Sequence, residues 1–338
     1  MTLKNGWNEW GILAEKGIRK ETLSKDEALA VLRAEEDEVL TILDAAFKVR
    51  KHFYGKKVKL NMIVNAKSGL CPEDCGYCSQ SSQAQNEIDR YPLLEKEALV
   101  KGAEEAMRRK AGTYCIVASG RGPTDKEVEH VASAVEEITA AYPLKICACL
   151  GILKEHQAVR LKEAGVHRYN HNLNTHKDHH GEITTTHTYE DRVGTVNHAK
   201  EAGLSPCSGL IAGMGETDEQ LIEALFALRE LDADSIPINL LHPIPGTKLE
   251  NQNGVGPMRS LKILALSRFI LPHKEIRVSG GREVNLRSLQ PLALYAANSI
   301  FVGDYLTTGG QIAESDHQMI KDLGFDIEEN ALEDAILP

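Results

Sequence analysis

The sequence lacks any apolar run long enough to span a bilayer. Residues 1–20 also lack the unbroken apolar core of a signal peptide, because charged residues interrupt that segment throughout. Basic residues are in deficit: 39 Lys and Arg stand against 49 Asp and Glu, which gives a net charge of -10. That charge would repel a polyanion rather than hold it by counterion release. We therefore predict a cytoplasmic protein without a membrane or nucleic-acid partner.

A complete set of disulfides is also absent, because seven cysteines cannot all pair. Without an export signal, these thiols are kept reduced, which favours metal binding or catalysis over disulfide formation. Hydrophobic residues make up 42% and charged residues 26% of the chain, as in a globular protein with a sizeable core.

Short β-rich runs alternate with amphipathic segments from about residue 59 onward. This alternation is typical of parallel βα units. We predict strands near 59–65, 113–119, 145–150, 167–173, 205–213, 235–241, 275–280 and 299–303. The predicted helices follow at 95–110, 124–141, 154–164, 189–203, 217–231, 257–271, 286–297 and 314–323. Eight such units favour an α/β fold of the closed (β/α)8 TIM type. An open doubly wound sheet is the alternative, but no glycine-rich dinucleotide fingerprint follows the first strand.

The barrel is expected over residues 56–325, between two flanking segments. Residues 1–55 form a predicted N-terminal helical extension. In it, Ser24 to Glu27 reads as a capping box after a polar start, and one long helix is expected to follow. That helix would carry apolar residues at Leu29, Leu32, Val39, Leu40, Leu43, Ala46 and Phe47. Residues 326–338 form an acidic, peripheral C-terminal tail.

Three cysteines lie in a segment of nearly thirty residues without periodicity, directly after the first predicted strand. Cys71, Cys75 and Cys78 have the spacing C-x3-C-x2-C. Three thiolates from one loop can hold three irons of a cubane cluster and leave the fourth iron open for a small molecule. Structural zinc is the alternative, but it usually takes four ligands from paired C-x2-C units, and ferredoxin runs are spaced differently.

The segment CPEDCGYC, with Tyr77 as its aromatic residue, resembles the motif of the radical S-adenosylmethionine (SAM) superfamily. The stretch GLIAGMGE resembles a second superfamily motif through Gly209, Ile211, Gly213 and Glu216. The resemblance implies a 4Fe–4S cluster on Cys71, Cys75 and Cys78. Its open iron would chelate SAM, and the reduced cluster would cleave SAM to a 5′-deoxyadenosyl radical. Tyr77 and Ile211 would belong to the cofactor site.

The other four cysteines fall in predicted strands: Cys115, Cys147, Cys149 and Cys207. Side chains from different barrel strands can converge on one site, although a buried cysteine is commonly a small core residue. The chain resembles the biotin synthase family over residues 40–325, in segments such as YCIVASGRGP, YNHNLNT and SIPINLLHPIPGTKL. This resemblance implies a 2Fe–2S cluster on Cys115, Cys147, Cys207 and Arg277. Cys149 is an alternative to Cys147, since residues two apart on a strand share a face. Arg277 is alternatively an ion-pair partner inside the barrel.

The same resemblance implies the residues that contact small molecules. Asn172 would lie between SAM and dethiobiotin, and Asn174 stands where the family often has an Asp that binds the ribose of SAM. Lys67 and Asn239 match positions near the ureido ring and in the substrate pocket. A separate metal site among His171, His176, His179, His180 and His187 is disfavoured by their irregular spacing.

Taken together, the resemblance implies sulfur insertion that converts dethiobiotin to biotin, with the 2Fe–2S cluster as sulfur donor. It also implies a flavodoxin- or ferredoxin-type electron donor and a homodimer. Other radical SAM enzymes, such as those that make methylornithine or mature hydrogenase, are the nearest alternative and would lack the full set of Cys115, Cys147, Cys207 and Arg277. A non-catalytic iron–sulfur or zinc scaffold is the alternative from a different class.

Overall fold

Parallel strands form the centre of the computed structural model, which describes residues 6–69 and 71–328. Within these residues, β1, β2, β3, β4, β5, β7, β8 and β9 pair in that order, and β9 pairs again with β1, so the sheet closes into a barrel. The closed ring excludes the open doubly wound alternative. The strands are β1 (Lys57–Lys67), β2 (Thr113–Ala118), β3 (Lys145–Cys149), β4 (Arg168–Asn170), β5 (Ser205–Cys207), β6 (Leu210–Ala212), β7 (Ser235–Leu240), β8 (Glu275–Val278), β9 (Ser299–Phe301) and β10 (Asp326–Ile327).

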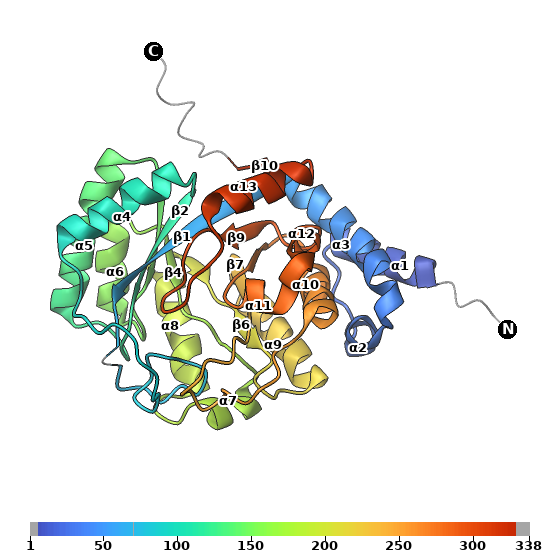
Figure 1. Ribbon diagram of the computed structural model, residues 1–338, viewed down its shortest axis with the longest axis horizontal. Coiled ribbons are helices and arrows are strands. Elements are labelled where there is room, and N and C mark those ends of the chain that lie inside the picture. Colours follow the sequence, from blue (N-terminus) through green and yellow to red (C-terminus); the bar gives the residue numbers. More distant parts are fainter. Residues whose placement is uncertain (1–5, 70, 329–338) are drawn as a thin grey trace, which may run out of the picture.

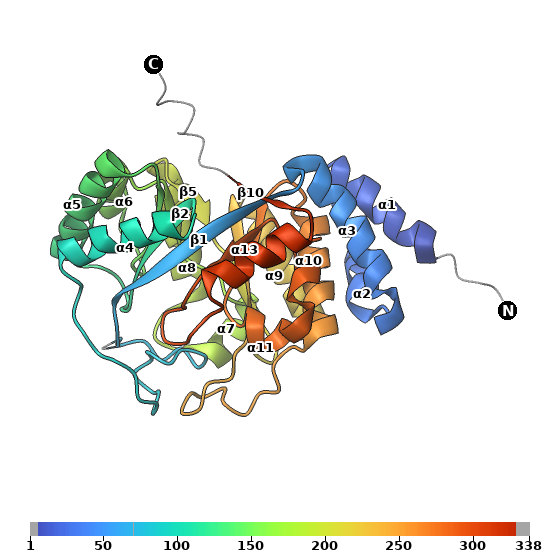
Figure 2. The same cartoon turned by 45° about the horizontal axis from the view of Figure 1, so that its top comes forward.

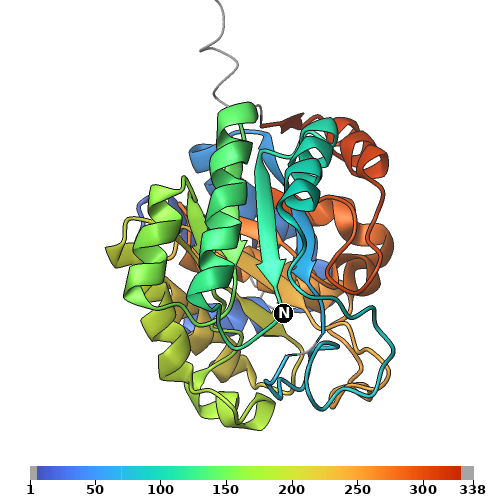
Figure 3. The ribbon, with the colours of Figure 1, turned by 90° about the vertical axis from the view of Figure 1, so that its left-hand side faces the viewer.

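Helices surround this barrel on its outer side (Figure 1). They are α4 (Lys96–Arg108), α5 (Asp125–Ala141), α6 (Glu155–Glu163), α7 (Lys177–Ile183), α8 (Tyr189–Glu201), α9 (Asp218–Glu230), α10 (Pro257–Ile270), α11 (Arg282–Leu286), α12 (Gln290–Ala293) and α13 (Ala313–Asp322). Figure 3 shows β2 between α4 and α5. The predicted βα alternation is therefore confirmed. No described helix is long and apolar enough to cross a membrane.

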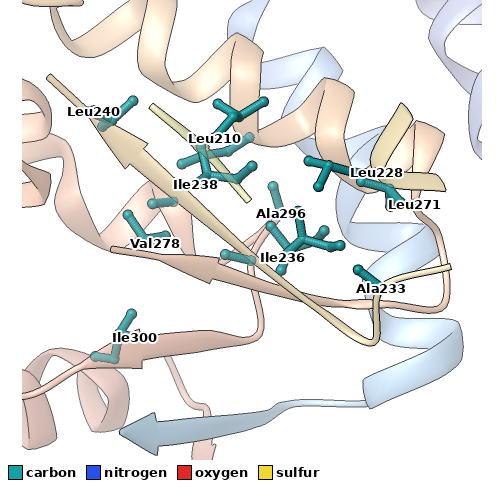
Figure 4. Close-up of a cluster of buried hydrophobic side chains, with 14 of the residues drawn as sticks. Leu210, Leu228, Ala233, Ile236, Ile238, Leu240, Leu271, Val278, Ala296 and Ile300 are labelled. Carbon is teal, nitrogen blue, oxygen red and sulfur yellow. The ribbon is translucent and has the colours of Figure 1, made fainter. Parts of the chain in front are cut away.

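Inward and outward side chains alternate along the barrel strands, as β7 shows. In β7, Ile236 and Ile238 are fully buried against the surrounding helices, whereas Pro237 and Asn239 line the interior cavity. Figure 4 shows the apolar layer on the helix side, where Leu228 and Leu271 meet the outward-facing strand residues. Burying one such side chain contributes about 1.5–3 kcal/mol to the free energy of folding, so this apolar layer stabilises the barrel. The inward positions can therefore carry polar side chains.

Three helices precede the barrel, where we predicted a polar start and one long helix. They are α1 (Gly6–Ile18), α2 (Lys25–Arg33) and α3 (Val39–Tyr54), and the predicted capping box of Ser24 and Glu27 is present. The single helix was wrong because Ala34 and Glu35 adopt extended backbone and a 3-10 turn at Glu36–Glu38 starts a new direction. The break leaves Leu40 64% exposed, contrary to its expected core position. Figure 1 shows α1, α2 and α3 beside α10.

Other differences concern the ends of elements. The predicted strand 205–213 is divided into β5 and β6, which both pair with β7. The predicted helix 286–297 is instead α11, a 3-10 turn at Arg287–Leu289 and α12, with Pro291 at the start of α12. Helix α7 forms within a segment we expected to be a loop. Asp326 and Ile327, assigned to the tail, form β10 and pair with β1; the tail residues 329–338 lie outside the described residues.

Candidate active site

A cavity of about 410 Å³ opens at the carboxyl ends of the barrel strands. Its size is typical of pockets that enclose a small organic ligand. Long loops surround this end: the loop that follows β1 and the loop before α10 project together in Figure 2 and meet where Gln85 N donates to Gly246 O at 2.8 Å. Of the residues predicted to form the site, the cavity lining includes Cys71, Cys75, Tyr77, Cys78, Cys115, Cys147, Asn172, Asn174, Ile211, Asn239 and Arg277.

The first three cysteines lie together on the loop after β1. Contacts with the segment after α7 fix this loop: Asp74 accepts hydrogen bonds from the Thr184 hydroxyl at 2.6 Å and the Thr185 amide at 2.9 Å, and Gly76 N donates to Ile183 O at 2.9 Å. Burial raises the pKa of Cys78 to about 12. A buried thiol of this kind becomes a thiolate when a metal cation binds it.

The arrangement of these thiols fits a polynuclear cluster. All seven cysteines are free. Across residues 6–69 and 71–328, no three His, Cys, Asp or Glu side chains are placed to hold a single metal ion. Three free thiols on one cavity-lining loop match the number of ligands that a cubane cluster with one open iron would need, whereas the closed tetrahedron of structural zinc needs four.

The second set of cysteines converges deeper in the barrel. Cys115 on β2 is in register with Cys147 on β3, and both are buried. The neighbouring Cys115 thiol and burial raise the pKa of Cys147 well above its usual range, whereas its contact with Cys207 acts in the opposite direction. Cys147 therefore contacts both other thiols. Cys149 also lines the cavity, and burial together with Cys207 raises its pKa to about 12, but Cys147 is the β3 residue next to both Cys115 and Cys207.

Arg277 on β8 completes this set and is only 2% exposed. Its Nη2 donates to Glu275 Oε1 at 2.6 Å and to Ser235 Oγ at 2.9 Å, so the predicted ion pair inside the barrel exists. Arg277 nevertheless also lines the cavity with Cys115 and Cys147, and Cys207 and Cys115 act on it electrostatically. Burial alone would raise the pKa of Glu275, but Arg168, Arg277 and Lys59 hold it well below its usual range.

Asparagines at the end of β4 connect the two cysteine sets. Asn174 Nδ2 donates to the Tyr77 phenol oxygen at 2.6 Å. Asn172 Oδ1 accepts from Asn170 Nδ2 at 3.0 Å, and the same Asn170 amide reaches Cys207 Sγ at 3.1 Å. On β7, which pairs with β6, Asn239 donates to Leu210 O at 3.1 Å and accepts from Gly280 N at 3.0 Å. The cavity wall therefore presents amide groups between the thiols of the loop and those of the barrel.

The second superfamily motif has a clear structural basis. Glu216 accepts hydrogen bonds from Gly213 N at 2.6 Å and Met214 N at 2.8 Å, which closes the turn after β6. A Cβ on Gly209 would lie 1.9 Å from Pro237 O, so only glycine allows this segment and β7 to approach so closely. These features place Ile211 against the cavity.

Two predicted site residues are not among those that line the cavity: the fully buried Cys207, and Lys67. Lys67 lies at the end of β1, and its Nζ is 2.7 Å from Glu127 Oε1, outside the residues that line the cavity. A role for Lys67 at the ureido ring therefore stays a prediction without support from this geometry.

Three residues of the site were not predicted from the sequence: Asn170, Arg192 and Glu275. Asn170 belongs to the YNHNLNT segment, so its motif could have indicated it. Arg192 Nη1 donates to Asn172 O at 2.8 Å, and Nη2 lies 2.6 Å from His187 Nε2, which also contacts Glu73 through Nδ1. Arg192 sits in an amphipathic helix and Glu275 at the start of a strand, where neither has a distinguishing sequence signal.

Comparisons with known proteins decide the family. The model of the radical SAM superfamily matches residues 67–228, and that of the Biotin and Thiamin Synthesis associated domain matches residues 237–326. The chain is 62% identical over 323 residues to a biotin synthase of Bacillus pumilus, covering 96% of this chain and 98% of the relative. It is 63% identical over 319 residues to a biotin synthase of Lysinibacillus sphaericus, covering 94% and 96% of the two chains. The chain belongs to the biotin synthase family.

As a member of the biotin synthase family, the chain is a radical SAM enzyme, and its superfamily implies a 4Fe–4S cluster with SAM. Solved structures share its barrel at low identity. Methylornithine synthase superimposes with a TM-score of 0.82 at 21% identity, covering 96% of this chain and all of that one. The FeFe-hydrogenase maturase from Carboxydothermus hydrogenoformans gives 0.78 at 21% identity, covering 95% and 79%. These likenesses show the fold alone.

Proposed function

We propose that this chain converts dethiobiotin to biotin by radical SAM sulfur insertion, with two iron–sulfur clusters in one barrel. The observation that carries the proposal is that free thiols from two separate sets line one cavity of about 410 Å³. The loop set is Cys71, Cys75 and Cys78, and the barrel set is Cys115, Cys147 and Cys207 with Arg277. When bound, the 4Fe–4S cluster with SAM supplies a 5′-deoxyadenosyl radical, and the 2Fe–2S cluster supplies the sulfur.

The protein's own groups orient the small molecules between these two sets. Asn172 and Asn174 present amides at the end of β4, between the loop thiols and Cys207, where they can bond to SAM hydroxyls and to the ureido ring. Ile211 and Tyr77 give this part of the wall its apolar and aromatic surface, and Asn239 faces the cavity from β7. Holding both reactants in one enclosed site favours the reaction by orientation and by exclusion of water.

Buried cations beside the barrel set support the assignment of a second cluster. Arg277 and Arg168 both favour the ionised forms of Cys147 or Cys207. Thiolates are the form in which cysteine binds iron. Cys147 is the proposed β3 ligand, since it lies next to both Cys115 and Cys207, and Cys149 is left as a cavity-lining thiol.

Three further proposals rest on family membership and on the free thiols. We propose a flavodoxin- or ferredoxin-type protein as the electron donor and a homodimer as the assembly. We propose the cytoplasm as the compartment, because free cysteines stay reduced in that compartment.

The test is anaerobic incubation of reconstituted, reduced protein with SAM and dethiobiotin, with 5′-deoxyadenosine and biotin measured together by mass spectrometry. Both products are expected. Cys207→Ala should still form deoxyadenosine but no biotin, whereas the matched variant Cys149→Ala should form both. Deoxyadenosine without biotin from the unmodified chain would indicate another radical SAM substrate. Neither product from protein that holds its 4Fe–4S cluster would overturn the enzyme function.

A further inference from the structure

Beneath the barrel thiols lies a buried ionic network centred on Glu275, which is 6% exposed at the start of β8. Its Oε2 accepts from Arg168 Nη1 at 3.0 Å and from Lys59 Nζ at 3.1 Å. Its Oε1 accepts from Arg277 Nη2 at 2.6 Å. The four charged side chains come from β1, β4 and β8, so the network ties three barrel strands together at the level below the cavity.

Two serine hydroxyls complete the contact between Glu275 and Arg277. Ser235 Oγ donates to Glu275 Oε1 at 3.0 Å and accepts from Arg277 Nη2 at 2.9 Å. Ser299 Oγ donates to the same carboxylate oxygen at 3.1 Å and accepts from Arg277 Nε at 3.3 Å. A hydroxyl has one proton and two lone pairs. Because Glu275 takes both protons, each hydroxyl has a lone pair for the guanidinium, and Ser299 Oγ also accepts from Asn61 Nδ2 at 2.8 Å.

These bonds occupy one edge of the Arg277 guanidinium. They use Nε and Nη2, while Nη1 makes no hydrogen bond to any residue that the structure describes. The Cζ of Arg277 also lies 4.9 Å from the centre of the Phe301 ring, which fixes the plane of the group from another side. Arg277 lines the cavity together with Cys115 and Cys147, and the buried Cys207 acts on it electrostatically. Nη1 is thus the guanidinium nitrogen left for a ligand.

We propose that Glu275 is a positioning residue for the second cluster: with Ser235 and Ser299 it holds Arg277 so that Nη1 is presented beside the barrel thiols. The proposal rests on the proposed function, since it assumes a cluster at that site. Groups behind metal ligands commonly orient them in this way, and their loss typically weakens metal binding about 10–100-fold.

The net charge of the network allows a positioning role of Glu275 to be distinguished from a purely electrostatic effect on the cluster. Lys59, Arg168 and Arg277 carry three positive charges against one on Glu275, a formal sum of +2 beneath three thiols. Glu275→Gln raises that sum to +3. A purely electrostatic role therefore predicts that an anionic cluster is retained longer in this variant, whereas a positioning role predicts that it is lost faster.

The experiment reconstitutes the full chain with 57Fe and sulfide and follows the two clusters by Mössbauer and visible spectroscopy during challenge with an iron chelator. We expect Glu275→Gln to lose the second cluster about 10-fold faster, with altered Mössbauer parameters for its iron. The 4Fe–4S cluster and deoxyadenosine formation should be unchanged. The matched control is Asp316→Asn, which breaks another buried ion pair, with Arg282, away from the cavity lining and should leave the second cluster as in the unmodified chain.

A second pair of variants covers the case in which Glu275→Gln does not fold. Ser235→Ala and Ser299→Ala each remove one hydroxyl and keep every charge, and each should change the second cluster in the same direction. The positioning role would be overturned if, in all folded variants, the second cluster kept its spectrum and survived the chelator as long as in the unmodified chain or longer. Absence of any second cluster from the unmodified chain would instead refute the proposed function, and the two failures are thereby distinguished.

Discussion

The side-chain amide of Asn174 donates to the phenol oxygen of Tyr77 across 2.6 Å. This bond joins the loop of the first three cysteines to the end of β4. Asn174 is held from both sides, because its N donates to Gly209 O at 3.0 Å and its O accepts from Ile211 N at 2.8 Å. Its backbone lies in the left-handed region, with φ of 69°. Asn and Asp tolerate that conformation better than other residues with side chains.

Substitutions at Asn174 test whether this contact shapes the SAM site. Asn174→Asp keeps both the tolerance for positive φ and an acceptor for the Tyr77 hydroxyl, so the KM for SAM should stay within about twofold. Asn174→Ala loses the bond and strains the backbone, and the KM should rise about 3–10-fold. Rates of deoxyadenosine formation at varied SAM give both values. Equal KM values for the Ala variant and the unmodified chain would refute a role for the contact.

The close approach of Gly209 to β7 predicts a steric effect on stability and on the cavity. Gly209→Ala would press a methyl group against Pro237 O, so the strand must move at a cost of about 1–3 kcal/mol in the free energy of unfolding. Asn239, two residues further along, should move with it and raise the KM for dethiobiotin. The control is Gly194→Ala in α8, where a Cβ meets nothing within 4 Å. It should stabilise the chain by about 0.5–1 kcal/mol in urea unfolding.

Strand periodicity in the sequence predicted most of the barrel because each inward position is followed by an apolar one, as in Ile236 and Ile238. The break between α2 and α3 was not predicted because it contains no glycine or proline. Acidic residues cap a new 3-10 turn at this point instead. Among the site residues, the loop cysteines follow from their spacing alone. Lys67 does not reach the cavity because the β1–β2 register shifts between Asn65 and Lys67, and such a bulge redirects the next side chain.

The His180 side chain predicts how the stability of the fold depends on pH. It is 5% exposed, and burial, aided by Arg192 and His187, lowers its pKa to about 4 from the ordinary 6.5. Between these values the unfolded chain binds a proton that the folded chain does not. The contribution of His180 to stability is therefore lost as pH falls from about 6.5 to about 4. The Tm of the apoprotein should therefore fall less over that pH range in His180→Gln than in the unmodified chain. Parallel curves for the two proteins would contradict the assignment.

The ion pair of Arg282 and Asp316 joins α11 to α13 with Nη1 2.7 Å from Oδ1, and both side chains are almost fully buried, at 2% and 0% exposure. Asp316→Asn removes the fully buried carboxylate and leaves the guanidinium with the partly exposed Glu283, 3.0 Å from Nη2. The free energy of unfolding should therefore fall by about 1–3 kcal/mol in urea unfolding. The exposed pair of Asp44 and Lys48 on α3 offers a comparison, since both side chains are more than half exposed. Asp44→Asn should lower the free energy of unfolding by less than about 1 kcal/mol, because water and salt screen that pair.

If both variants lost the same small amount of stability, water must hydrate the Arg282 guanidinium in Asp316→Asn. Burial of the pair would then not determine its contribution to stability. If only Asp316→Asn is strongly destabilised and yet keeps its second cluster, instability alone cannot explain cluster loss in Glu275→Gln.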